Sequence, residues 1–104
     1  MEYGEQANGT EISVHAGEEF EVALAETRTA GYRWTISENG EPVLQLVEEV
    51  SLPNVGSVGG AGQRQWQFRA ASPGETEIKM RYVRSWEKSS EPARTFTLKV
   101  HVRS

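Results

Sequence analysis

The chain has 104 residues, of which 37% are hydrophobic and 25% charged, and a formal net charge of −4. The length and composition fit one globular domain over residues 1–104 and exclude a disordered tail. The eleven basic residues are fewer than the fifteen acidic ones and are scattered along the chain, which argues against nucleic acid as a partner. No apolar run approaches the roughly 20 residues of a membrane span, and without any cysteine the chain forms no disulfide and has no thiolate ligand or nucleophile.

Residues 1–9 precede the first patterned segment, and we expect them to form a flexible N-terminal segment. They lack the basic end and apolar core of a secretory signal. The chain as written is therefore expected in the cytoplasm, and in the periplasm or outside the cell if an export signal was trimmed.

Apolar and polar residues alternate from Thr10 to Val102, which is the period of a strand with one buried face. Seven strands are predicted, marked in chain order by Ile12 and Val14; Phe20, Val22 and Leu24; Tyr32, Trp34 and Ile36; Leu44 and Leu46; Trp66 and Phe68; Ile78, Met80 and Tyr82; and Phe96, Leu98, Val100 and Val102. In the fourth run Val47 and Val50 break the regular alternation, because Val47 has the opposite parity to Leu44, Leu46 and Val50; this indicates a bulge or an edge strand.

Short antiparallel strands with one apolar face each bury those faces by packing as two sheets. The pattern therefore predicts an all-β, immunoglobulin-like antiparallel β-sandwich of about seven strands. Trp34 and Trp66 share the parity of their apolar neighbours and are predicted to lie in the core.

Successive connections in such a chain alternate between the two ends of the sandwich. Those at one end, over 15–18, 37–42 and 72–75, are short and carry ordinary turn residues. Those at the other end run over 26–31, 52–63 and 84–94, and two of them are far longer than a hairpin requires. The second end is therefore predicted to be the functional one.

Catalysis and metal binding find little support in the sequence. His15 and His101 take the outward parity of their strands and are expected to be solvated, and no histidine–carboxylate cluster has the spacing of a metal site. The glycine-rich segment 56–62 is followed by a strand instead of the helix that a phosphate loop needs. We therefore predict no enzyme activity, no metal and no cofactor.

Two features of the functional end have two interpretations each. The glycines of 56–62 form either a plain hairpin connection or a backbone surface that a partner can approach closely, since they have no Cβ. Trp86 follows the sixth strand in a polar stretch, where it either caps the sandwich or anchors a partner.

Three stretches, at 27–34, 59–68 and 82–87, resemble in order and spacing the loop motifs of the chagasin-type inhibitors of papain-like cysteine peptidases. The family motifs are NPTTG-like before G-[YF]-x-W, GxGG-like before W-x-F, and R-P-W-like after Y-x-R. The chain departs from them at five positions: Thr27, Arg28, Ala30, Ala61 and Ser85.

The resemblance implies reversible inhibition of a papain-like cysteine peptidase by a monomer whose three loops occlude the active-site cleft. Thr29 would approach the catalytic Cys and His of the peptidase, the backbone of 59–62 would follow the substrate subsites, and Trp86 would stack on the leaving-group side. Arg84 would orient its loop or pair with an acidic residue of the enzyme. The peptidase-binding residues implied are Thr27, Arg28, Thr29, Ala30, Gly31, Gly59, Gly60, Ala61, Gly62, Arg84, Ser85 and Trp86.

A second class of function stays open beside the inhibitor. The domain could be a non-inhibitory sandwich module that binds another protein or a carbohydrate. A sugar site favours aromatic side chains at outward strand positions, whereas the strand aromatics of this chain have inward parity.

Overall fold

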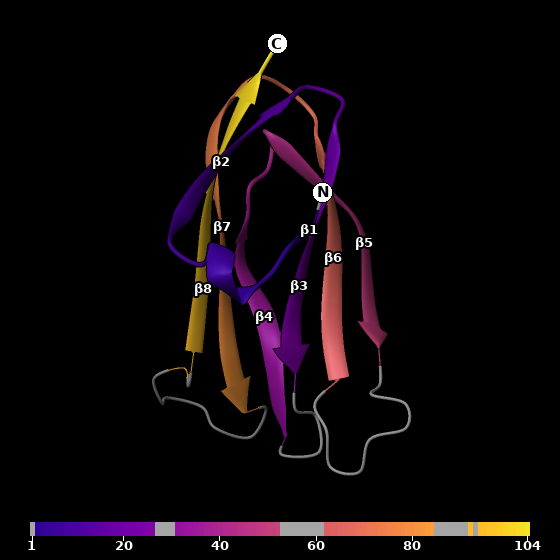
Figure 1. Ribbon diagram of the computed structural model, residues 1–104, viewed down its shortest axis with the longest axis vertical. Helices are drawn as coiled ribbons and strands as arrows, with labels where there is room; N and C mark the ends of the chain where they lie inside the picture. Colours follow the sequence, from indigo (N-terminus) through magenta and orange to yellow (C-terminus); the bar gives the residue numbers. More distant parts are fainter. Residues whose placement is uncertain (1, 27–30, 53–61, 85–91, 93) are drawn as a thin grey trace.

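The structure, a computed structural model, describes residues 2–26, 31–52, 62–84, 92 and 94–104. These residues form two packed four-stranded sheets (Figure 1). Sheet A has the strand order β1-β3-β6-β5 and sheet B the order β2-β8-β7-β4. The strands are β1 (Glu2–Tyr3), β2 (Thr10–His15), β3 (Glu19–Glu26), β4 (Tyr32–Asn39), β5 (Leu44–Leu52), β6 (Gly62–Ala70), β7 (Gly74–Arg84) and β8 (Arg94–Arg103), with a 3-10 helix, η1, at Glu5–Ala7.

The seven predicted strands correspond to β2 through β8, and the β-sandwich class is confirmed. The four pairings β3–β6, β5–β6, β4–β7 and β7–β8 are antiparallel, as predicted. Two edge pairings, β1–β3 and β2–β8, are parallel. The strands of each pair are distant in sequence and no hairpin joins them, so the alternating up-and-down course of the chain does not determine whether they pair parallel or antiparallel.

The N-terminal segment, for which we expected flexibility, pairs with the sandwich in the structure. β1 pairs with β3, and the Tyr3 ring lies edge-on to Phe20 with 6.0 Å between centroids. The Gly9 amide donates to the Thr97 carbonyl (2.7 Å), and Asn8 Oδ1 accepts from the Thr97 amide (2.9 Å). Residues 2–9 are thus bound to both sheets, because a strand edge and backbone partners were available to a segment with no apolar pattern of its own.

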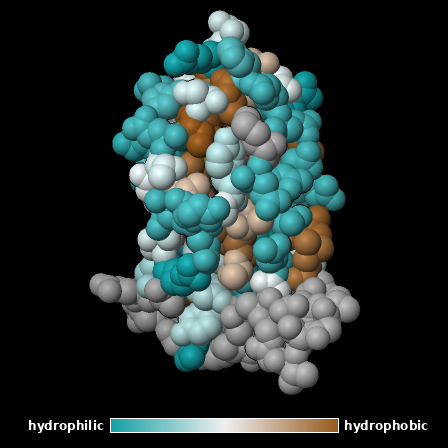
Figure 2. Space-filling view, in the orientation of Figure 1, coloured by the Kyte–Doolittle hydropathy of each residue, from teal (hydrophilic) through white to brown (hydrophobic). Residues whose placement is uncertain are grey.

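The inner faces of the two sheets supply one core. Trp34 and Trp66 are 4% and 1% exposed, which confirms their predicted burial, and Phe20 stacks on Phe68 at a centroid distance of 5.6 Å. Polar residues cover most of the face seen in Figure 2, as strands with one buried face require. Among the described residues there is no helix with the length and apolar character needed to cross a membrane.

Strand β5 carries both features that its broken parity predicted. It lies at the edge of sheet A, and its register with β6 shifts between Leu46 and Glu48, which leaves Val47 half-exposed at the bulge. Beyond the bulge, Glu49 pairs with Trp66 and Ser51 with Arg64. The bulge thereby places these two polar residues on the side of β5 that faces the sandwich interior.

Candidate functional site

The strand ends that flank the three long connections meet at one end of the sandwich, the lower end in Figure 1. The pairs there are Glu26 with Gly62 and Leu52 with Gln63 in sheet A, and Tyr32 with Arg84 and Tyr82 with Arg94 in sheet B. The flanks of the three connections are therefore gathered as strand alternation predicts, and the chain enters and leaves each connection at this end.

Three of the twelve predicted binding residues, Gly31, Gly62 and Arg84, lie within the described ranges. The other nine fall outside the described residues: Thr27, Arg28, Thr29, Ala30, Gly59, Gly60, Ala61, Ser85 and Trp86. Gly31 has φ +84°, a left-handed conformation that strains any residue with a Cβ. Glycine at this position lets the first connection turn directly into β4.

A stack of rings and cations lies at the base of the first and third connections. Tyr32 stacks on Tyr82 (5.0 Å between centroids), and Tyr82 lies 4.8 Å from Trp34. The Arg84 guanidinium sits 4.7 Å above the Tyr32 ring, and that of Arg94 is 5.9 Å from the Trp34 ring. Cation–π contacts of this kind hold both ends of the third connection against β4, which favours an orienting role for Arg84.

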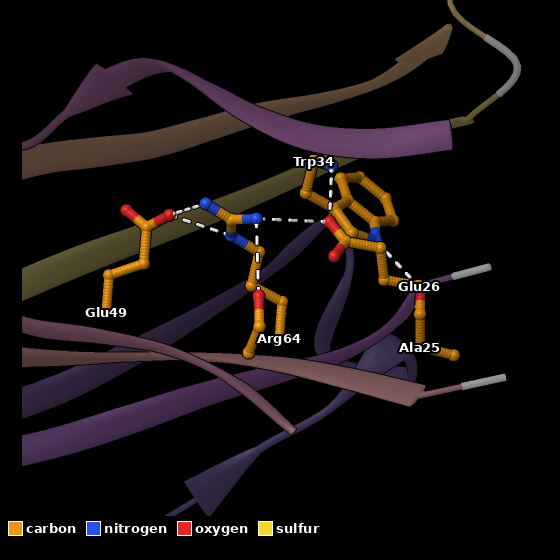
Figure 3. A network of polar contacts seen from close by, with 6 residues as sticks. Ala25, Glu26, Trp34, Glu49 and Arg64 are labelled. Carbon is orange, nitrogen blue, oxygen red and sulfur yellow. Dashed lines mark hydrogen bonds and ion pairs between the residues drawn. The ribbon is translucent and has the colours of Figure 1, made fainter. Parts of the chain in front are cut away.

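A polar network, shown in Figure 3, lies at the base of the first and second connections. Glu26, which is 1% exposed, accepts a hydrogen bond from the Trp34 amide at Oε2 (2.9 Å), and Arg64 Nη1 lies 3.6 Å from the same oxygen. Arg64 also pairs with Glu49 through Nη2 and through Nε, which is 2.7 Å from Oε2. The Trp34 indole Nε1 donates to the Ala25 carbonyl at 2.9 Å. The network therefore joins the end of β3 to β4, β5 and β6.

Sequence reasoning did not identify Glu26, Arg64 or Glu49. A signal for the first two was present, since Glu26 continues the inward parity of the β3 apolar run, and Arg64 continues that of the β6 run. Glu49 had no such signal, because only the exact place of the bulge turns it inward.

His101 takes the outward position that we expected, and it also contacts two carboxylates there. On the outer face of sheet B, its Nε2 lies 2.7 Å from Glu11 Oε2 and its Nδ1 lies 2.9 Å from Glu75 Oε1. The hydrogen bond to Glu11 raises the pKa of His101, helped by Glu75 and opposed by desolvation, and the same bond lowers the pKa of Glu11. Within the described ranges, no group of three His, Cys, Asp or Glu side chains could hold a metal ion.

We expect His101→Gln to change how stability depends on pH. A raised His101 pKa stabilises the fold below the ordinary histidine pKa of about 6.5, and this contribution is lost as pH rises through the folded pKa. A lowered Glu11 pKa contributes above about pH 4.3 and is lost as pH falls through its folded value. The stability difference between wild type and variant should therefore be larger at about pH 5.5 than at about pH 8.5 in urea unfolding. Exposed His15→Gln is the control, and an equal His101→Gln difference at both pH values would contradict the prediction.

The two antiparallel-dominated sheets, with the flanks of three connections gathered at one end, define an immunoglobulin-like β-sandwich. The family model of the Chagasin family peptidase inhibitor I42 matches residues 13–100. The chain therefore belongs to the chagasin family of peptidase inhibitors, which are inhibitors and not enzymes. This confirms the resemblance that the three loop motifs carried.

Individual relatives agree with this assignment. Amoebiasin-1 of Entamoeba histolytica is 33% identical over 103 residues, which cover 98% of this chain and 99% of the relative. The crystal structure of EhICP2, a cysteine protease inhibitor from Entamoeba histolytica, superposes with a TM-score of 0.88 and 28% identity, covering 98% of this chain and 94% of EhICP2. PbICP-C, solved in complex with falcipain-2, is 14% identical with a TM-score of 0.64 over 99% of this chain and 88% of that chain, and shares the fold.

Proposed function

We propose that this protein is a reversible inhibitor of papain-like cysteine peptidases that occludes the active-site cleft with its three connections over 27–31, 53–61 and 85–93. The observation that carries the proposal is the meeting of all six flanking strand ends at one end of a sandwich of the chagasin family. The description of the relative EhICP2 as a cysteine protease inhibitor supports this target class.

The physical basis of tight inhibition is preorganisation. A loop whose two ends are held loses less conformational entropy when it enters a narrow cleft, so more of the contact energy appears as affinity. The cation–aromatic stack at Arg84 and the polar network at Glu26 hold the loop bases in this way. A total interface of about 1,600 Å² would suffice, with one central aromatic anchor worth about 2 kcal/mol or more.

Each predicted loop residue has a role in this proposal. Thr29 approaches the catalytic Cys and His, the glycine-bearing backbone of 59–62 follows the substrate subsites, and Trp86 stacks on the leaving-group side. Arg84 orients the third loop from beneath, in line with its position over Tyr32. The protein acts as a monomer in this mechanism and needs neither nucleic acid nor a membrane.

The carbohydrate alternative is disfavoured by where the strand aromatics lie. Trp34, Trp66, Phe68, Tyr82 and Phe96 are all buried, so none of them belongs to an exposed platform on a sheet face. A sugar ring stacks on an accessible aromatic face, which these residues do not offer.

Titration of papain and of a cathepsin-like peptidase with the purified protein, followed with a fluorogenic substrate, tests the proposal. We expect saturable loss of peptidase activity that reverses on dilution. No inhibition of several papain-like enzymes by the folded protein would overturn the proposal and favour the non-inhibitory binding module.

Trp86→Ala is expected to raise the inhibition constant about tenfold or more, because a central aromatic anchor is lost. Val47→Ala is the control, since Val47 is an exposed apolar residue at the β5 bulge, outside the three connections. We expect Val47→Ala to leave the inhibition constant unchanged. An unchanged constant for a correctly folded Trp86→Ala variant would count against the assigned role of Trp86.

A further inference from the structure

The inward-facing residues of the sandwich change from apolar to polar at the end that carries the long connections. The inward positions of β3 are apolar at Phe20, Val22 and Leu24, yet the next inward residue is Glu26, which is the one buried charged residue of the described ranges. The inward positions of β6 and β5 also become polar there, at Arg64, whose side chain is 20% exposed, and at Glu49, which is exposed to solvent on the edge strand. We call the ion pairs among Glu26, Arg64 and Glu49 the interior network.

Stability alone does not explain the interior network. Removing a carboxylate and a guanidinium from water is costly, and their attraction often only offsets that cost, so apolar side chains of similar volume generally stabilise a core at least as well. Leucine at 26 would continue the apolar run of β3. What an ion pair adds over apolar contacts is direction, because its hydrogen bonds form in few geometries.

The members of the interior network come from the strands that border the first two connections. Glu26 is the last residue of β3, before 27–30, and it holds Trp34 at the start of β4, after that connection. Glu49 belongs to the end of β5, before 53–61, and Arg64 is the third residue of β6, after that connection. One continuous set of contacts therefore runs from the base of the first connection to the base of the second.

The Glu26–Trp34 contact also bridges the two sheets. β3 belongs to sheet A, whereas β4 is the edge strand of sheet B, so Glu26 accepts an amide hydrogen that belongs to the other sheet. The Trp34 indole donates to the Ala25 carbonyl, also in β3. Two hydrogen bonds donated by Trp34 thus tie the start of β4 to the end of β3.

Arg64 lies at the centre of the interior network, where its planar guanidinium reaches both Glu26 and Glu49. Its Nε and Nη2 face Glu49, while Nη1 faces Glu26 at 3.6 Å and Ser51 Oγ at 3.5 Å. A guanidinium can meet partners on two sides at once in fixed directions, whereas a lysine ammonium is a point charge on a flexible stem. The relative position of the bases of the two connections is therefore coupled through one side chain.

We infer that the interior network is a positioning device for inhibition: Glu26, Arg64 and Glu49 hold the bases of the 27–31 and 53–61 connections in the one relative orientation that fits a peptidase cleft. This inference rests on the proposed function. The three side chains are positioning residues, which act through the loops without touching the peptidase.

The double variant Glu26→Gln/Arg64→Met tests this inference because it removes both charges together and leaves no buried charge behind. We expect its melting temperature to stay within about 5 °C of wild type. The inhibition constant against papain should rise about tenfold or more, mainly through slower association, because only a fraction of the molecules hold both loops correctly. Arg69→Met, on the exposed side of β6, is the matched control and should change neither quantity.

Arg64→Lys separates position from charge. It keeps the cation but not the fork, so we expect it to weaken inhibition about as much as the double variant does. Inhibition by the folded double variant within about twofold of wild type would overturn the inference. It would also fall if Val102→Ala, a core change at the opposite end of the sandwich, weakened inhibition as much at a similar loss of melting temperature.

A readout without any peptidase distinguishes failure of this inference from failure of the proposed function. In Glu49→Gln the Arg64 side chain loses its main anchor, so the amide of Trp34 should exchange its hydrogen about fivefold faster or more, although Glu49 does not touch Trp34. Neighbouring Glu48→Gln, whose strand position faces the other side of β5, is the control. Equal Trp34 exchange in both variants would overturn the coupling, whereas a wild-type protein that inhibits nothing would overturn only the proposed function.

Discussion

Phe68→Ala should lower the free energy of unfolding by about 3–5 kcal/mol, the usual cost of removing a fully buried aromatic ring. Phe68 is 0% exposed and stands in β6 between Phe20 of β3 and Leu46 of β5. Its ring stacks on Phe20 at 22°. Truncation therefore leaves a cavity in the middle of sheet A that neighbouring strands, held by their ladders, cannot close.

Urea unfolding followed by tryptophan fluorescence measures this loss. Phe68→Leu keeps most of the apolar volume and should cost roughly 1–2 kcal/mol, which makes a graded series. Arg69→Ala, at the next and outward position, should change stability by less than about 0.5 kcal/mol. A Phe68→Ala loss below about 1 kcal/mol would contradict the burial assigned to this ring.

Arg64→Met should destabilise the fold by about 3 kcal/mol, since it removes the Arg64 cation from the buried Glu26 carboxylate. The remaining one-fifth exposure of the Arg64 side chain admits some water, so we place the loss at the lower end for a broken buried pair. The double variant Glu26→Gln/Arg64→Met should recover most of this stability, because no charge then remains in the interior.

A double-mutant cycle on Glu26 and Arg64 measures the coupling directly. We expect a coupling free energy of about 1–3 kcal/mol from urea unfolding of the two single variants, the double variant and wild type. Additive losses, with the double variant the least stable of the four, would show that the two charges do not interact in the folded protein. The same four proteins serve for the inhibition measurements, so stability and function are compared on one set.

The predictions for Phe68 and for Arg64 differ in how far the sequence alone supports them. The burial of Phe68 follows from alternation in 66–70, because a strand with one covered face must carry its apolar residues at every second position. The edge position and bulge of β5 follow in the same way from Val47, which cannot share a face with Leu44, Leu46 and Val50 in a regular strand. The gathering of the connections follows from alternation as well, and the order of their motifs gave the family.

Other features have no local signature. Segment 2–9 has no strand pattern, and its pairing depends on an edge of β3 and a carbonyl of Thr97 that exist only in the folded sandwich. The parallel pairing of β2 with β8 joins the two ends of the chain, and no short connection constrains it. His101 meets Glu11 and Glu75 across strands for the same reason.

The sequence by itself determined the sandwich, its buried face, the irregular fourth run and the end that carries the long connections, because each of these depends on the two-residue period of a strand. Only the tertiary structure decided that Glu26, Arg64 and Glu49 meet. That contact depends on the register of three strands and on the residue at which β5 bulges, and a shift of one position would turn Glu49 outward. The period of a strand determines which side of the sheet a residue faces, whereas the register between strands determines which residues of the neighbouring strands it contacts.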